Sequence, residues 1–167
     1  EYLLWVGCAG SLDDKAKRYV AMICESAEQA GKLIDDLLEF SRMGRTALQS
    51  RELPIAELVQ DVWRKLLPER TGRDIELHVG ELPSIKADPA MLEVAFSNLM
   101  SNAVKYTSRR EKAVIDVEAR SNGDDVEIIV RDNGVGFDMR YVDKLFGVFQ
   151  RLHGDEFEGV GIGLANV

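Results

Sequence analysis

The sequence predicts an α+β fold: an α/β sandwich with a mixed sheet and helices on one face, preceded by an antiparallel helical hairpin that dimerises as a four-helix bundle. Apolar residues over 12–43 recur at alternating spacings of four and three, which is the pattern of one long helix with a packing seam. From about residue 52, short alternating segments mix with amphipathic helical ones in no regular βαβ order, which indicates an α+β domain.

The predicted packing seam of the long helix consists mainly of small and branched apolar residues. These are Ala16, Val20, Ile23, Ala27, Ala30, Ile34 and Leu37. Ser11 is the expected N-cap, and residues 1–8 resemble the end of a preceding helix, joined through a short glycine-containing connection. An isolated antiparallel pair buries too little of such a face, so we expect two copies to pack together. The alternative is that the stripe packs on the second domain of the same chain.

The hairpin is expected over 1–45 and the second domain over 46–167. The expected elements of that domain are a short strand at 52–54, a helix with Ile55, Leu58, Val59, Val62 and Leu66 on one face, strands at 75–79 and 84–87, a helix from Asp88 to about Tyr106, and two strands, 115–120 and 126–131, joined by a turn at Asn122-Gly123. Asp88 followed by Pro89 is a cap and a first-turn proline, so it marks a helix start.

Composition excludes several classes of protein. No run approaches the roughly 20 apolar residues that a membrane helix needs. A net charge of -8 argues against a broad surface for nucleic acid, so we expect no nucleic-acid partner. The two cysteines, Cys8 and Cys24, lack metal-type spacing, which suits buried thiols in a reducing, cytoplasmic environment.

Three short motifs carry the chemistry. In NLMSNAVKYT (98–107), Asn98 and Asn102 are four apart on one helix face, where amide oxygens suit Mg²⁺ and a nearby lysine suits a phosphate. In DNGVGFD (132–138), a carboxylate ends a strand and can accept a bond from an exocyclic amine. In GVGIGL (159–164), backbone N–H groups can cradle phosphates. Taken singly, each motif also fits a purely structural role: asparagines on a helix surface, an ordinary Asn-Gly turn and a glycine-rich loop.

Order and spacing remove this ambiguity, because together the motifs resemble those of the bacterial-type sensor histidine kinases, whose ATP-binding fold is shared with the gyrase, Hsp90 and MutL ATPases. NLMSNAVKYT resembles the family's N box, DNGVGFD its first glycine box, LFGVFQRLH (145–153) its F box and GVGIGLANV (159–167) its second glycine box. The helix ending LIDDLLEFSRMGR (33–45) resembles the second helix of the dimerisation and histidine-phosphotransfer domain.

The resemblance implies ATP and Mg²⁺ as cofactors, a homodimer through the helical hairpin, and a response-regulator receiver domain as partner. It implies that Asn102 coordinates Mg²⁺ with Asn98 beside it, that Lys105 contacts phosphate and that Tyr106 lies against the adenine or sugar. Asp132 would accept a bond from the adenine amine. The remaining site residues would be Gly134 and Gly136 at the adenine, Gly159, Gly161 and Gly163 at the phosphates, and Arg151 at the γ-phosphate.

The chain departs from the family pattern at the nucleophile. Its only histidines are His78, in a predicted strand, and His153, at the edge of a polar segment that could cover the ligand. Neither matches the family's phosphoacceptor, which we expect upstream of residue 1, and the C-terminal end of the domain is expected to continue past residue 167. The leading hypothesis is a dimeric histidine autokinase. The alternatives are an ATPase of the gyrase or MutL type, and a degenerate kinase that acts as a nucleotide-binding scaffold.

Overall fold

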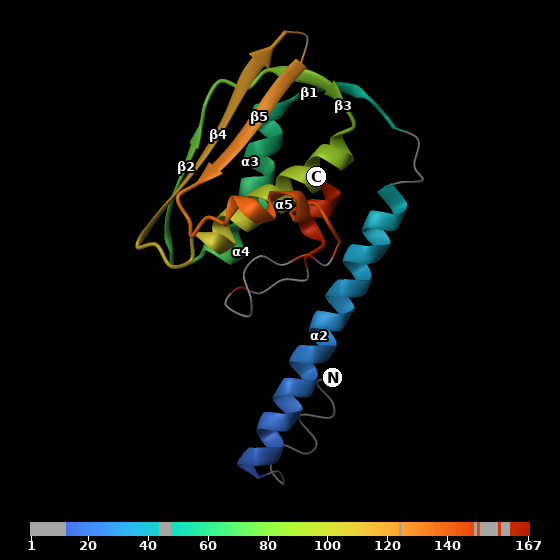
Figure 1. Cartoon of the computed structure of the whole chain (residues 1–167), viewed down its shortest axis with the longest axis vertical. Helices are drawn as coiled ribbons and strands as arrows, with labels where there is room; N and C mark the ends of the chain where they lie inside the picture. Colours follow the sequence, from blue (N-terminus) through green and yellow to red (C-terminus); the bar gives the residue numbers. More distant parts are fainter. Residues whose placement is uncertain (1–12, 44–47, 124, 149, 151–156, 158–160) are drawn as a thin grey trace. The chain divides into compact units, whose positions relative to one another are not determined.

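The chain forms two compact units, Glu1–Gly44 and Arg45–Val167. The computed structural model describes residues 13–43, 48–123, 125–148, 150, 157 and 161–167 (Figure 1). The predicted first helix at 1–8 lies outside these residues. No helix among the described residues is both long and apolar enough to cross a membrane.

The first unit contains the long helix that the seam predicts, α2 (Asp14–Met43). Its cap is Asp13, whose Oδ1 accepts a hydrogen bond from the backbone N of Ala16 at 2.7 Å. The expectation of Ser11 as cap is therefore wrong, because the helix begins at Asp14, two residues later than predicted, where the carboxylate of Asp13 can reach a free N–H group of the first turn. The predicted hairpin partner and the four-helix bundle stay predictions.

A mixed three-stranded sheet forms one layer of the second unit, as predicted. In it, β4 (Lys112–Asn122) lies between β2 (Asp74–Val79), with which it is parallel, and β5 (Asp125–Asp132), with which it is antiparallel. A separate antiparallel pair joins β1 (Arg51–Pro54) to β3 (Ser84–Ala87). The tight connection from β4 to β5 requires a left-handed backbone at Gly123, with φ of 66°.

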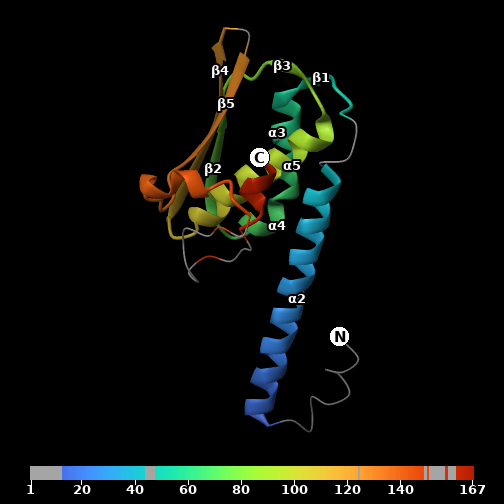
Figure 2. The same ribbon diagram turned by 45° about the vertical axis from the view of Figure 1, so that its right-hand side comes forward.

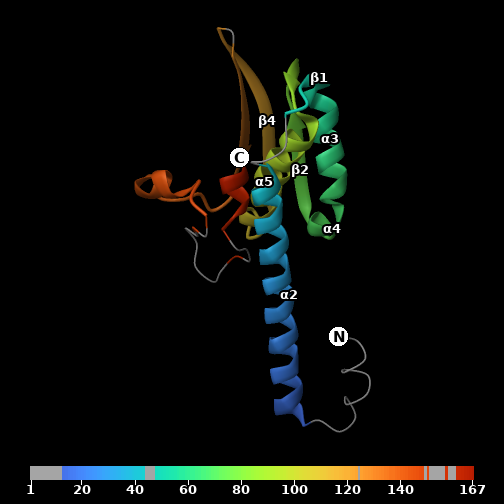
Figure 3. The same ribbon diagram turned by 90° about the vertical axis from the view of Figure 1, so that its right-hand side faces the viewer.

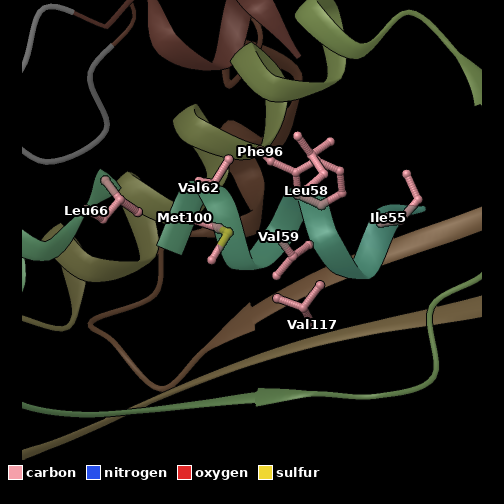
Figure 4. Close-up of a cluster of buried hydrophobic side chains, with 8 residues drawn as sticks. All are labelled: Ile55, Leu58, Val59, Val62, Leu66, Phe96, Met100 and Val117. Carbon is pink, nitrogen blue, oxygen red and sulfur yellow. The ribbon is translucent and has the colours of Figure 1, made fainter. Parts of the chain in front are cut away.

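Helices α3 (Ile55–Lys65), α4 (Leu67–Arg70) and α5 (Pro89–Tyr106) form the second layer, and α3 and α5 lie on the same face of the sheet (Figure 2). The main hydrophobic core lies where these helices pack on the sheet. Figure 4 shows Val59 of α3 pointing toward Val117 of β4. The buried members of this cluster are Ile55, Leu58, Val59, Val62, Leu66, Phe96, Met100 and Val117. All five apolar residues predicted for this helix are among them: four lie on one face of α3, and Leu66 is its C-cap.

Asp88 fixes the start of α5, as its sequence context predicts. Its Oδ1 accepts hydrogen bonds from the backbone N of Ala90 and Met91, at 3.0 and 3.3 Å. Its Oδ2 accepts one from the backbone N of Gln49 at 2.8 Å, and these bonds, led by that from Gln49, hold the pKa of Asp88 below its usual value. The carboxylate thus joins the N-terminal end of the second unit to the helix that carries the N-box motif.

Candidate nucleotide-binding site

Three segments that are distant in sequence meet at the C-terminal half of α5. One is α5 itself, the second is the loop that follows β5, and the third is the short 3-10 helix η2 (Gly163–Asn166), which packs against α5 (Figure 3). Another 3-10 helix, η1 (Met139–Lys144), follows the loop and is capped by Asp138. The N box, the first glycine box and the described part of the second glycine box, 161–167, therefore lie together.

Asn98 lies directly beside the second glycine segment. A Cβ atom at Gly163 would lie 2.9 Å from Asn98 Oδ1, closer than real Cβ atoms come, so a larger residue at 163 would displace the Asn98 side chain. Asn102, one turn later on α5, is half-buried. The two amide side chains offer neutral oxygen ligands on one helix face. This arrangement fits a Mg²⁺ ion whose other ligands are phosphate oxygens and water.

The loop after β5 is tied to the end of α5. The backbone N of Gly134 donates to Asp132 Oδ1 at 2.8 Å, and the backbone N of Val135 donates to the carbonyl of Tyr106 at 3.2 Å. Asp132 is exposed, and among the described residues its Oδ2 accepts no hydrogen bond. One oxygen therefore orders the loop while the other remains for a donor such as an exocyclic amine.

Gly136 and Gly161 both adopt left-handed backbone conformations, with φ of 65° and 79°. A Cβ at Gly136 would meet nothing within 4 Å, so the backbone is open to a ligand at this point. A Cβ at Gly161 would lie 2.5 Å from the carbonyl oxygen of Gln150, so this glycine is needed for packing within the chain as well as for its φ.

Two aromatic rings near the end of α5 each contact a positively charged side chain. The ring of Tyr106 meets that of Phe157 edge to face, with centroids 5.2 Å apart, and Phe157 is buried. Lys105 Nζ lies 4.6 Å from the centre of the Tyr106 ring, and the Arg109 guanidinium lies 5.3 Å from that of Phe157. Lys105 follows Asn102 by three positions on α5, so the two residues lie on the same side of the helix. The predicted site residues Arg151 and Gly159, and also His153, lie outside the described residues.

Sequence reasoning missed the residues that brace the end of α5. Arg73, just before β2, donates from Nη1 to the carbonyl of Val104 at 2.7 Å and from Nη2 to Thr107 Oγ1 at 3.2 Å. Thr107 is fully buried, and its hydroxyl donates to the carbonyl of Ala103 at 2.8 Å. This arrangement satisfies carbonyls at the C-terminus of the helix. No local signal marks Arg73, because its partners lie more than 30 residues away in sequence.

Comparison with known proteins shows what this fold is similar to: residues 87–167 match the family of histidine kinase-, DNA gyrase B- and HSP90-like ATPases. The methanogenesis regulatory histidine kinase FilI of Methanothrix harundinacea is 34% identical over 155 residues, which cover 92% of this chain. Over most of its length the chain is therefore similar to a histidine kinase, and residues 87–167 are the part that matches the ATPase family.

Solved structures share this fold. Full-length ShkA in complex with AMPPNP aligns with a TM-score of 0.65 and 29% identity, over 93% of this chain and 33% of that one. Histidine kinase ThkA in complex with response regulator protein TrrA aligns with a TM-score of 0.67 and 19% identity, over 92% of this chain and 46% of that one. The chain spans 17% of the length of FilI and 22% of that of the phytochrome-like protein Cph1 of Synechocystis.

Replacing Gly134 with alanine should displace the loop that carries Asp132. The added Cβ would lie 2.6 Å from both the Tyr106 carbonyl oxygen and Asp132 Oδ1, and a backbone carbonyl cannot move aside as a flexible side chain can. We expect ATP binding to weaken at least about tenfold, which corresponds to the loss of about one charge-assisted hydrogen bond. Isothermal titration of ATP measures this effect.

Gly80→Ala is the matched control, because its Cβ would meet atoms only at ordinary contact distances of 3.6 Å and more. Its ATP affinity should equal that of the wild type. Wild-type affinity in Gly134→Ala would show that the close approach of the loop to α5 is not needed for binding.

Proposed function

We propose that the chain is the core of a sensor histidine kinase that binds Mg-ATP, transfers the γ-phosphoryl group to a histidine of its dimerisation helices, and then passes it to an aspartate of a response-regulator receiver domain. The observation that carries this proposal is the convergence of Asn98, the Asp132 loop and Gly163 around the end of α5. The relative FilI is a histidine kinase, and the ThkA structure contains a response regulator protein.

Different residues bind the adenine, the Mg²⁺ ion and the phosphates. Asp132 accepts a hydrogen bond from the adenine amine, and the open backbone at Gly136 lies against the base. Asn102 coordinates Mg²⁺ with Asn98 lining the same site, and bound Mg²⁺ neutralises charge on the phosphates. The phosphates are held by Lys105 and by the glycines at 159, 161 and 163, with Arg151 at the γ-phosphate and Tyr106 against the adenine or sugar. Catalysis then consists mainly of positioning and charge neutralisation.

The phosphoacceptor in this proposal is not His78. That side chain is exposed on β2, with Nδ1 2.9 Å from Asp116 Oδ1 on the neighbouring strand and Nε2 3.6 Å from Glu76 Oε2. Its neighbours Leu77 and Val79 pack toward the helices, so His78 projects from the opposite face of the sheet. An acceptor on the dimerisation helices, outside the 167 residues, is the one we propose.

The exposed seam of α2 supports homodimerisation. Ile23, Ile34 and Leu37 are 66%, 59% and 47% exposed in a single chain. A stripe of branched apolar residues at heptad spacing is stabilised when a second helical pair covers it, which favours a four-helix bundle formed by two copies.

A gyrase- or MutL-type ATPase fits less well. Such an enzyme needs a carboxylate that activates water, and position 98, where we would expect it, is an asparagine whose amide oxygen faces Gly163. The degenerate-scaffold alternative retains nucleotide binding and differs only in the transfer step.

The experiment is to incubate the full-length protein with γ-labelled ATP and Mg²⁺ at neutral pH. We expect acid-labile, base-stable label on the protein, which is the signature of phosphohistidine, and its transfer to a receiver domain. Asn102→Ala should abolish labelling, whereas Ser101→Ala, whose hydroxyl donates to Glu69 of α4 at 2.8 Å, should retain it. ATP binding without any label would favour the scaffold, and release of free phosphate without label would favour the ATPase.

A further inference from the structure

The loop that carries Asp132 is held by an arginine from the connection between α5 and β4. Arg110 Nε donates to the carbonyl of Asn133 at 2.7 Å, and Arg110 Nη2 donates to the carbonyl of Gly134 at 2.9 Å. One guanidinium therefore binds two successive carbonyls, a geometry that its planar fork allows and a single ammonium group does not.

The side chain of Asn133 completes the attachment. Its Oδ1 accepts from the backbone N of Val114 at 3.0 Å, and its Nδ2 donates to the carbonyl of Lys112 at 3.1 Å. The backbone N of Asn133 also donates to the carbonyl of Val114 at 3.2 Å. The loop is thus bound to the start of β4 as well as to Arg110, and both attachments come from the segment 110–114.

Each of the two peptide groups that Arg110 contacts is held at both ends. The peptide between Asn133 and Gly134 accepts from Arg110 at its oxygen and donates from its N–H to Asp132 Oδ1. The next peptide accepts from Arg110 at its oxygen and donates from the N–H of Val135 to Tyr106. Neither plane can turn without losing a bond at each end, so Arg110 helps to set the orientation of the Asp132 carboxylate.

We propose that Arg110 is a positioning residue for base recognition: it holds residues 132–136 in the conformation in which Asp132 presents its second oxygen to the adenine amine. This inference rests on the proposed nucleotide-binding function. It assigns to Arg110, which lies outside all four sequence motifs, part of the preference for ATP over GTP.

The test is to measure ATP and GTP affinities of the full-length protein carrying Arg110→Ala or Arg110→Lys. Removing two solvent-exposed charge-assisted bonds should weaken ATP about tenfold. GTP should change less, because guanine carries a carbonyl oxygen at the position where adenine carries the amine that Asp132 would accept from. Lysine restores the charge but not the two-carbonyl geometry, so Arg110→Lys should resemble Arg110→Ala. Arg64→Ala, which removes an exposed arginine paired with Asp61 on α3, is the control and should bind both nucleotides normally.

A second measurement needs no nucleotide. Amide hydrogen exchange at Gly134 and Val135 should accelerate in Arg110→Ala and stay unchanged in Arg64→Ala. In addition, Arg110→Ala should add little to the effect of Asp132→Asn in the double variant, because the two residues act in series.

Equal weakening of ATP and GTP, full rescue by lysine, or unchanged exchange in Arg110→Ala would each overturn the positioning role. If Asp132→Asn lowers the ATP preference and Arg110→Ala does not, only this inference fails. If Asp132→Asn itself leaves the preference unchanged, the adenine role in the proposed function fails, and this inference fails with it.

Discussion

Asp132→Asn is expected to weaken ATP binding by about 10- to 150-fold and to leave GTP binding much less affected. The amide presents a donor where the adenine amine needs an acceptor, and the loss of a charge-assisted bond is worth about 1.5–3 kcal/mol. The exposed carboxylate, with one oxygen on the backbone N of Gly134 at 2.8 Å, is placed to make that bond with the other. Titration of both nucleotides against the full-length protein measures the ratio.

Asp125→Asn is the matched control, because it makes the same change at the opposite end of β5. Its affinities should equal those of the wild type. A uniform weakening of ATP and GTP in Asp132→Asn would show that the carboxylate orders the loop without reading the base.

If the proposed dimer forms through α2, replacing both Ile23 and Ile34 with lysine should convert it into monomers. Both positions lie on the α2 seam and are more than half exposed in a single chain, so a second copy would have to bury them. A dimer would then enclose four unpaired ammonium groups, each costing several kcal/mol, and its dissociation constant should rise by more than about 100-fold. Light scattering across a concentration series measures the mass.

The control adds the same two charges beside the seam, as Ala21→Lys with Met22→Lys, since both side chains are exposed and lie off the heptad positions. This protein should remain dimeric. If the seam variant also stays dimeric, the interface lies on another surface and the bundle proposal is wrong.

Local signals in the sequence were enough to predict most elements of the second unit. The cap at Asp88 with Pro89 and the apolar periodicity of 55–66 predicted α5 and the buried face of α3. These predictions succeed because capping and amphipathic periodicity depend on residues within one or two helical turns. The prediction of Ser11 as cap was wrong for a related reason. Several polar residues near the start of a helix can act as its N-cap, and only the path of the backbone decides which one does.

The order of the motifs proposes the members of the candidate site, and this membership stays a prediction; the geometry among the described members could not be predicted. That Asn98 lies against Gly163, and that Asp132 uses one oxygen for its own loop, follows from the packing of η2 and the β5 loop on α5.

The sequence by itself therefore determined most elements of the second unit, the buried face of α3 and the family that the nucleotide motifs resemble. Only the tertiary structure decided the parallel pairing of β2 with β4, the cap that Arg73 provides for α5, and the attachment of the Asp132 loop to Arg110. Each of these joins residues more than 20 positions apart, and each uses backbone carbonyls, which every residue possesses. Because every residue has a backbone carbonyl, the sequence does not indicate which carbonyl accepts a particular hydrogen bond. The donor is identified only from the folded structure.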